Sequence, residues 1–174
     1  FQFNSVTTSL MVFSGIAMAF SGAFLMLWLY GQDWFADFNL FGNNMRELFQ
    51  MHTINLSVAV WVGFIALFGI ATDDGVLMGT YLDQSFAKNK PGSIPEVRAA
   101  VVSAGLRRIK PAIMTSATTI IALLPVLTST GRGSDIMIPM AIPAVGGMVV
   151  ASVTYFIVPV LYCMREERKL KKQQ

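Results

Sequence analysis

Four long apolar stretches constrain the fold of this chain more than any other feature. They cover about residues 7–30, 56–81, 111–128 and 136–162, and the only charges within them are Asp73 and Asp74 in the second stretch. A helix needs about 20 mostly apolar residues to cross the hydrocarbon core of a bilayer. Charged residues make up 13% of the chain, whereas soluble domains carry about 25%. We therefore predict an all-α membrane protein with four transmembrane helices.

The basic residues indicate how these spans are oriented. Eleven of the thirteen Lys and Arg residues lie between the second and third spans or after the fourth. Positively charged loops stay in the cytoplasm, so both ends of the chain are expected there, with the basic tail over residues 165–174 facing lipid headgroups. Trp28, Tyr30, Trp34 and Phe35 cluster at the opposite end of the first span, as an aromatic belt would. The basic residues are Lys88, Lys90, Arg98, Arg107, Arg108 and Lys110, and then Arg165, Arg168, Lys169, Lys171 and Lys172.

The cytoplasmic linker has predicted structure of its own. Ser93 and Glu96 have the spacing of a capping box, with Pro95 at the first helical position. Apolar residues then recur at helical spacing, which predicts an amphipathic helix over about residues 94–107. We expect this helix to lie flat in the membrane interface before the third span. A helix in a soluble loop is the alternative.

The outer loop, about residues 31–55, is longer than a tight connection between two helices needs. We predict an extracytoplasmic excursion with a short helix around residues 45–52. His52 is the only histidine and Cys163 the only cysteine of the chain. Zinc-type sites need several such ligands close together, so we predict no metal site and no cofactor.

The distinctive chemistry of the sequence lies at Asp73 and Asp74. At a rise of 1.5 Å per residue, the pair lies about 7 Å to the cytoplasmic side of the midpoint of its span. An ionised carboxylate there costs at least about 2.5 kcal/mol, so it is expected to face the helix bundle or a water-filled cavity. Two neighbouring carboxylates cannot both be charged cheaply, so at least one should exchange a proton near neutral pH, as a proton carrier must. The alternative, a helix-end pair wetted by cytoplasmic water, is weakened because the span continues to Tyr81.

Small and hydroxylated residues are candidate neighbours of these carboxylates. Gly75 and Gly79 have the small-xxx-small spacing that lets another helix approach closely. The third span offers four hydroxyl groups, three of them on one face. We therefore predict that the Thr115 face of the third span packs against the two aspartates. Alternatively, the hydroxyls bond carbonyl groups four residues earlier in their own helix. The four residues are Thr115, Ser116, Thr118 and Thr119.

At these residues the chain resembles the membrane end of resistance–nodulation–division (RND) permeases. The matching stretches are residues 63–75, 107–115, 124–134 and 146–148. The most specific pattern is Arg-x-x-Pro-x-x-Met-Thr, followed by Pro-x-x-x-x-x-Gly-x-Gly-Ser. The resemblance covers nearly the whole chain. It implies that the four segments are the ninth to twelfth spans of a larger twelve-span fold.

The resemblance also implies a function. RND permeases are proton-coupled efflux transporters, and the sequence looks most like the branch that exports heavy-metal cations, in which an acidic residue commonly stands at the position of Asp73. The proton relay of the family also matches Thr115 and Arg108, and Asp74 is included as the neighbour of Asp73. Some metal pumps have a lysine directly after the proline, where this chain has Ala112. The positive partner of the carboxylates is therefore left open.

The partners follow from the same resemblance. We expect the remainder of the same pump with its porter domains, a homotrimer in the bacterial inner membrane, and a periplasmic adaptor with an outer-membrane channel. The chain is expected to contact membrane lipid and no nucleic acid, and to be a secondary transporter, not an enzyme. Two alternatives stay open: an RND-type permease for drugs, lipid or protein, and an intramembrane aspartyl protease. The protease needs two facing carboxylates, whereas Asp73 and Asp74 point about 100° apart on one helix.

Overall fold

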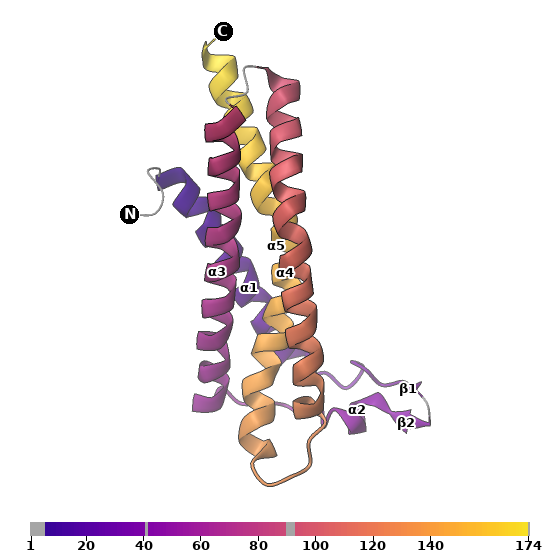
Figure 1. The fold of residues 1–174 in the computed structure, drawn as a ribbon. Coiled ribbons are helices and arrows are strands. Elements are labelled where there is room, and N and C mark those ends of the chain that lie inside the picture. The colour runs from indigo at the N-terminus through magenta and orange to yellow at the C-terminus, as the bar shows by residue number, and fades with distance from the viewer. Residues whose placement is uncertain (1–5, 41, 90–92, 174) are drawn as a thin grey trace.

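The computed structural model describes residues 6–40, 42–89 and 93–173, and it is largely helical (Figure 1). Within these ranges the chain forms five α-helices and one short hairpin. The helices are α1 (Val6–Tyr30), α2 (Met45–Leu48), α3 (Val58–Asn89), α4 (Ile94–Leu127) and α5 (Ser134–Gln173). The hairpin pairs β1 (Asn39–Leu40) with β2 (Asn43–Asn44) in antiparallel register.

Four of the helices are long and apolar enough to cross a membrane, which confirms the predicted all-α fold with four spans. The candidate spans are Phe13–Tyr30, Val58–Lys88, Ile94–Leu127 and Ser134–Lys171. Figure 1 shows α3, α4 and α5 as long rods side by side, with α1 crossing behind them at an angle. Helix α5 contacts α1, α3 and α4, and its residues 141–148 are all buried. The other three long helices therefore pack around α5.

Helix α4 corrects one prediction. Residues 94–107 do not form a separate interfacial helix, because α4 runs without a break from Ile94 to Leu127. Ser93 is the N-cap residue, as predicted, but its side chain accepts no capping hydrogen bond; its carbonyl accepts one from the Val97 N–H at 3.0 Å. The apolar stripe of this segment packs on neighbouring helices instead of lying on lipid. The buried cluster there contains Met78 and Leu82 of α3, Val101 and Ala104 of α4, and Val158 and Tyr162 of α5.

The connection between α1 and α3 contains the hairpin and α2, which falls within the short helix predicted around residues 45–52. Arg46 of α2 forms an ion pair of 3.0 Å with Asp33 and so ties α2 to the start of the connection. One residue of the predicted aromatic belt lies elsewhere. Tyr30 is fully buried, whereas Trp28 is exposed, because the end of α1 packs against the first turns of α5.

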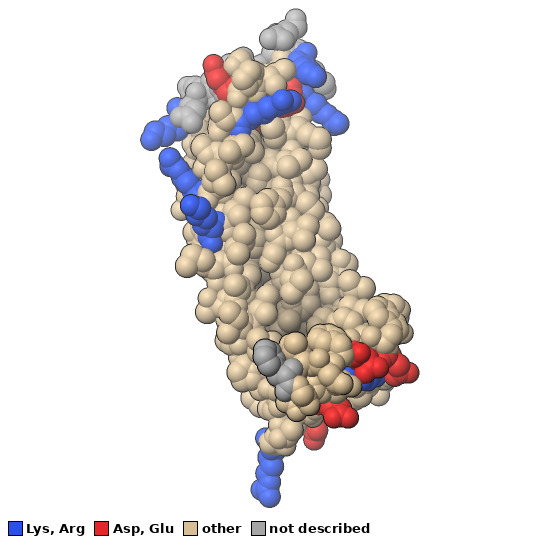
Figure 2. Space-filling model, turned by 90° about the vertical axis from the view of Figure 1, so that its right-hand side faces the viewer, with Lys and Arg blue, Asp and Glu red and all other residues tan. Residues whose placement is uncertain are grey.

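Charged side chains gather at the two ends of the bundle. On the face that Figure 2 presents, most of the Lys and Arg side chains lie on the upper part, with a few acidic ones among them. A group of Asp and Glu side chains lies toward the lower end, where some basic side chains are also visible, and a broad uncharged region separates the two ends. The end of α3, the start of α4 and the end of α5 lie at the upper end (Figure 1). These elements belong to the side predicted to be cytoplasmic. Of the residues used for that prediction, Lys90 lies outside the described residues, as does Gln174 of the predicted tail.

Helices approach each other closely where a glycine faces a neighbouring helix. A Cβ atom at Gly146 of α5 would lie 2.2 Å from the Cβ of Met26 in α1, and one at Gly22 of α1 would lie 2.8 Å from the Gly146 carbonyl oxygen. A Cβ atom at Gly63 of α3 would lie 2.2 Å from the Met140 carbonyl oxygen of α5. These crossings fix α1 and α3 on α5. The middle of α3, which contains both aspartates, is thereby held beside α5.

Candidate functional site

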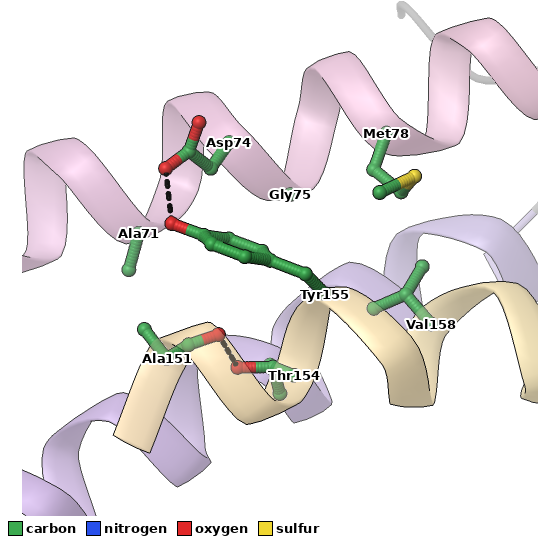
Figure 3. Close-up of a pocket in the computed structure, with 9 residues that line it drawn as sticks. Ala71, Asp74, Gly75, Met78, Ala151, Thr154, Tyr155 and Val158 are labelled. Carbon is green, nitrogen blue, oxygen red and sulfur yellow. Dashed lines mark hydrogen bonds between the residues drawn. The ribbon is translucent and has the colours of Figure 1, made fainter. Parts of the chain in front are cut away.

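The carboxylate of Asp74 lies at the centre of a buried polar network. Asp74 is 6% exposed, although it stands within an apolar helix. Its Oδ1 accepts a hydrogen bond from Nη2 of Arg108 in α4 at 2.8 Å, and the two groups form an ion pair. Its Oδ2 accepts a hydrogen bond from the Tyr155 hydroxyl of α5 at 2.7 Å. Figure 3 shows the Asp74 and Tyr155 side chains meeting between α3 and α5. One carboxylate therefore connects three helices.

A fourth residue extends this network. The Ser116 hydroxyl of α4 lies 2.7 Å from the Tyr155 hydroxyl, and both residues are buried. A tyrosine hydroxyl has a single proton to donate. Because Tyr155 donates that proton to Asp74, Ser116 must be the donor in its contact with Tyr155. The hydrogen bonds therefore all run toward the carboxylate, from Ser116 to Tyr155 and from both Tyr155 and Arg108 to Asp74.

Charges buried within a membrane span need compensation. A buried ion pair gains energy from the low local dielectric constant, but the lost hydration offsets much of that gain. Here both carboxylate oxygens also accept hydrogen bonds, and a hydrogen bond to a charged group contributes about 1.5–3 kcal/mol. One donor is left over, because the buried Nε–H of Arg108 has no acceptor within the described residues. Arg108 can therefore bond one further group.

A small cavity of about 20 Å³ adjoins the network on the side of α1, which is large enough for one water molecule. Asp74 and Tyr155 form part of its wall. Thr154 lines it as well, with its hydroxyl donating to the Ala151 carbonyl at 2.6 Å (Figure 3). The remaining lining residues are Gly15 of α1, Ala71, Gly75 and Met78 of α3, and Ala151 and Val158 of α5. Free space next to the carboxylate is therefore limited to about one solvent molecule.

Asp73 and Thr115 lie apart from this network. Asp73 is exposed and, among the described residues, forms no hydrogen bond or ion pair. Thr115 is exposed as well, and its hydroxyl donates to the Pro111 carbonyl at 3.0 Å. Thr118 and Thr119 also bond carbonyls four residues earlier, which is the alternative that the sequence left open. No hydrogen bond in the described chain joins Thr115 to either carboxylate; the next residue along α4, Ser116, reaches Asp74 through Tyr155.

Helix geometry places Asp73 and Thr115 on one face of the molecule. Asp74 and Ser116 both point toward Tyr155, and a step of one residue turns a side chain by about 100°. Helices α3 and α4 run side by side in opposite directions, with α5 behind them in Figure 1. Asp73 precedes Asp74 on α3 and Thr115 precedes Ser116 on α4. Both side chains therefore turn away from α5 and toward the same side of the two helices. This side of α3 and α4, which we call the open face, is not covered by the described residues.

The other predicted site residues have simpler surroundings. Gly75 lines the cavity and Gly79 is buried, and their role in helix packing stays a prediction. Arg108 is the positive partner of Asp74 that the sequence could not identify. Sequence reasoning missed Tyr155, because a single tyrosine in an apolar span follows no pattern. The available signal was its hydroxyl group, since a polar group within the bilayer needs a partner.

Residues 48–166 match the AcrB/AcrD/AcrF family, and this match includes every residue of the buried network. The chain is 32% identical over 167 residues to the cation efflux system protein CusA of Escherichia coli (strain K12), in an alignment that covers 92% of this chain and 14% of that protein. It is 29% identical over 162 residues to the cobalt-zinc-cadmium resistance protein CzcA of Cupriavidus metallidurans, with 92% of this chain and 13% of that protein covered.

A third relative is the nickel-cobalt-cadmium resistance protein NccA of Alcaligenes xylosoxydans xylosoxydans. It is 32% identical over 126 residues, with 70% of this chain and 11% of that protein covered. The chain thus spans only a small part of the length of these relatives, at most 14%. The family match extends over well more than half of the chain and includes two of the four candidate spans and most of a third, together with the buried network. The chain belongs to the AcrB/AcrD/AcrF family of RND efflux transporters.

Proposed function

We propose that this chain is the part of a proton-coupled RND efflux transporter that contains part of its proton relay, and that the exported substrates are heavy-metal cations. The observation that carries the proposal is the pair of adjacent carboxylates within α3. Asp74 is locked to Arg108 and Tyr155, whereas Asp73 has no partner within the described chain. A proton carrier must exchange partners as it loads and releases its proton. Asp73 is free to exchange partners, and it lies next to the fixed ion pair of Asp74 and Arg108.

The position of Asp73 supports a relay that extends into the remainder of the pump. Facing lipid at this depth would cost an ionised carboxylate at least about 2.5 kcal/mol. We therefore infer that the open face is covered by other transmembrane helices of the transporter. Thr115 borders the same face. The resemblance to RND permeases implies a carboxylate on the fourth span of the complete transporter, which would face Asp73 there and complete the relay.

The substrate proposal rests on the relatives. CusA is named a cation efflux protein, and CzcA and NccA are named for resistance to cobalt, zinc, cadmium and nickel. A permease for drugs, lipid or protein would share the carboxylates but has no comparable support among these three. An intramembrane protease has less, because both oxygens of Asp74 are engaged by neighbouring helices and Asp73 points away from it. The assembly we propose is a homotrimer in the bacterial inner membrane with a periplasmic adaptor and an outer-membrane channel.

The proposal predicts that Asp73→Asn abolishes metal resistance. The complete transporter is expressed in a metal-sensitive bacterial strain, and growth is measured on copper, silver, zinc, cobalt and cadmium salts and on drugs and dyes. Because an amide cannot carry the proton, we expect the variant to grow like cells without the pump at normal protein level. Asp83→Asn on the same helix is the matched control and should retain resistance. Normal resistance in Asp73→Asn would contradict the relay, and wild-type resistance to drugs alone would contradict the cation substrate.

A further inference from the structure

We propose that Tyr155 is a positioning residue of the proton relay and that, with Ser116, it fixes the orientation of Asp74 and thereby of Arg108. This inference rests on the proposed function. The first step is geometric. An aspartate side chain paired only with a flexible arginine can rotate with its partner, whereas the Tyr155 hydroxyl is carried on a rigid ring that is itself 7% exposed. Its bond of 2.7 Å to Oδ2 fixes the second oxygen of the carboxylate.

Ser116 determines which way the tyrosine hydroxyl points. It donates to the Tyr155 oxygen at 2.7 Å, and with that lone pair occupied the tyrosine proton is directed to Asp74. The ring, the serine and the carboxylate come from three positions on α5, α4 and α3. The orientation of Asp74 therefore reports how these helices are arranged. Any movement that separates α5 from α3 also releases one oxygen of the carboxylate.

The surroundings of Asp74 make this contact important for proton transfer. Groups from four helices lie around Asp74. Asp73 is its neighbour on α3, Arg108 faces it from α4, and Tyr155 faces it from α5. Gly15 of α1 lines the cavity beside it. Tyr155 thus supplies one of two direct hydrogen-bonding contacts to the carboxylate. Removing its hydroxyl should change how readily the pair of aspartates exchanges protons, and not only how firmly the helices pack.

A second tyrosine provides a matched control. The Tyr162 hydroxyl donates to Oδ1 of Asp83 at 2.5 Å, so the same kind of contact joins the same two helices, α3 and α5. Tyr162 lies seven residues further along α5, about two helical turns toward the predicted cytoplasmic end. A purely structural role for such a contact would be similar at both sites. A role in the relay would be confined to Tyr155.

The test compares Tyr155→Phe with Tyr162→Phe in the complete transporter, reconstituted in proteoliposomes. Metal-driven proton movement is recorded with an internal pH dye at saturating Zn²⁺ or Cu⁺ over a series of external pH values. We expect Tyr155→Phe to shift the midpoint of the pH profile by roughly one unit, where one unit is a tenfold change in proton affinity. The Tyr162→Phe profile should coincide with that of the wild type. Coinciding profiles for both variants, or equal shifts in both, would overturn the assignment.

Folding is checked by gel filtration and by protein yield. If Tyr155→Phe does not fold, Ser116→Ala replaces it, with Ser152→Ala as its control, because the Ser152 hydroxyl bonds the Met148 carbonyl of its own helix. A shifted profile in Ser116→Ala alone supports the proposal, and an unchanged profile refutes it.

The proposed function fails separately, when Asp73→Asn transports normally. If Asp73→Asn is inactive and Tyr155→Phe keeps the wild-type profile, only the inference about Tyr155 is wrong.

Discussion

Two adjacent aspartates have opposite surroundings, and this contrast is the main finding at the scale of the residue. Asp74 is buried and bonded through both oxygens, while its neighbour Asp73 is exposed on the open face. Removing one partner of a buried ion pair typically costs about 3–5 kcal/mol, because the other charge is left uncompensated. Asp74 is thus expensive to disturb, whereas Asp73 can change its charge without breaking a contact in this chain. We expect the mobile proton to reside on Asp73 for this reason.

Thr115 allows a test of the open face at the same scale. We predict that Thr115→Ala lowers proton-coupled transport about tenfold, equivalent to about 1.4 kcal/mol in the barrier, because its hydroxyl borders the path to Asp73. The measurement is the initial rate of metal-driven proton movement in proteoliposomes. Thr128→Ala is the control, since the Thr128 hydroxyl also bonds carbonyls of α4 but lies at its outer end. Equal rates in the two variants would remove Thr115 from the relay.

At the scale of the element, the crossing of α1 over α5 shows how the helices are held together. Lipid tails are as apolar as leucine side chains, so helix association in a membrane depends on close packing. The sequence suggested Gly75 and Gly79 as a close-packing pair, which stays a prediction, and the structure shows a close approach at Gly22 and Gly146. Spacing did not identify the approach at Gly22 and Gly146, because it depends on where α1 and α5 cross.

A methyl group added at this crossing should separate the two helices. At Gly146 a Cβ would lie 2.2 Å from the Met26 Cβ and 2.9 Å from the Gly22 carbonyl oxygen. We predict that Gly146→Ala destabilises the transporter by about 1–3 kcal/mol, the usual cost of overpacking. Thermal unfolding in detergent would show this as a lower transition temperature. Gly131→Ala, where a Cβ would meet nothing within 4 Å, should leave the transition unchanged, and equal melting of both variants would contradict the crossing.

At the scale of the whole molecule, the four spans and the helical class could be predicted because apolar length alone specifies them. The long, continuous helix α4 could not be predicted from the sequence. The stripe that includes Val101 and Ala104 is apolar whether it faces lipid or other helices, and in the structure it packs on α3 and α5. For the site, the sequence identified Asp74 as a candidate because charges are costly in a span, and Arg108 because of the resemblance to RND permeases. Tyr155 was missed, because its role arises only when α5 is placed beside α3.

The orientation of the whole chain follows from its charge distribution and is open to direct measurement. Loops rich in Lys and Arg remain in the cytoplasm, so the end of α5 and the connection between α3 and α4 should lie inside the cell, and the hairpin outside. We predict that Lys171→Cys in a Cys163→Ser background resists an impermeant maleimide in intact spheroplasts and reacts after permeabilisation. Asn43→Cys in the hairpin should react in both conditions. Both positions are exposed in the structure, so access to the reagent depends on the side of the membrane. Ready labelling at 171 in intact spheroplasts, with protection at 43, would reverse the orientation and direct the proton path through Asp73 the other way.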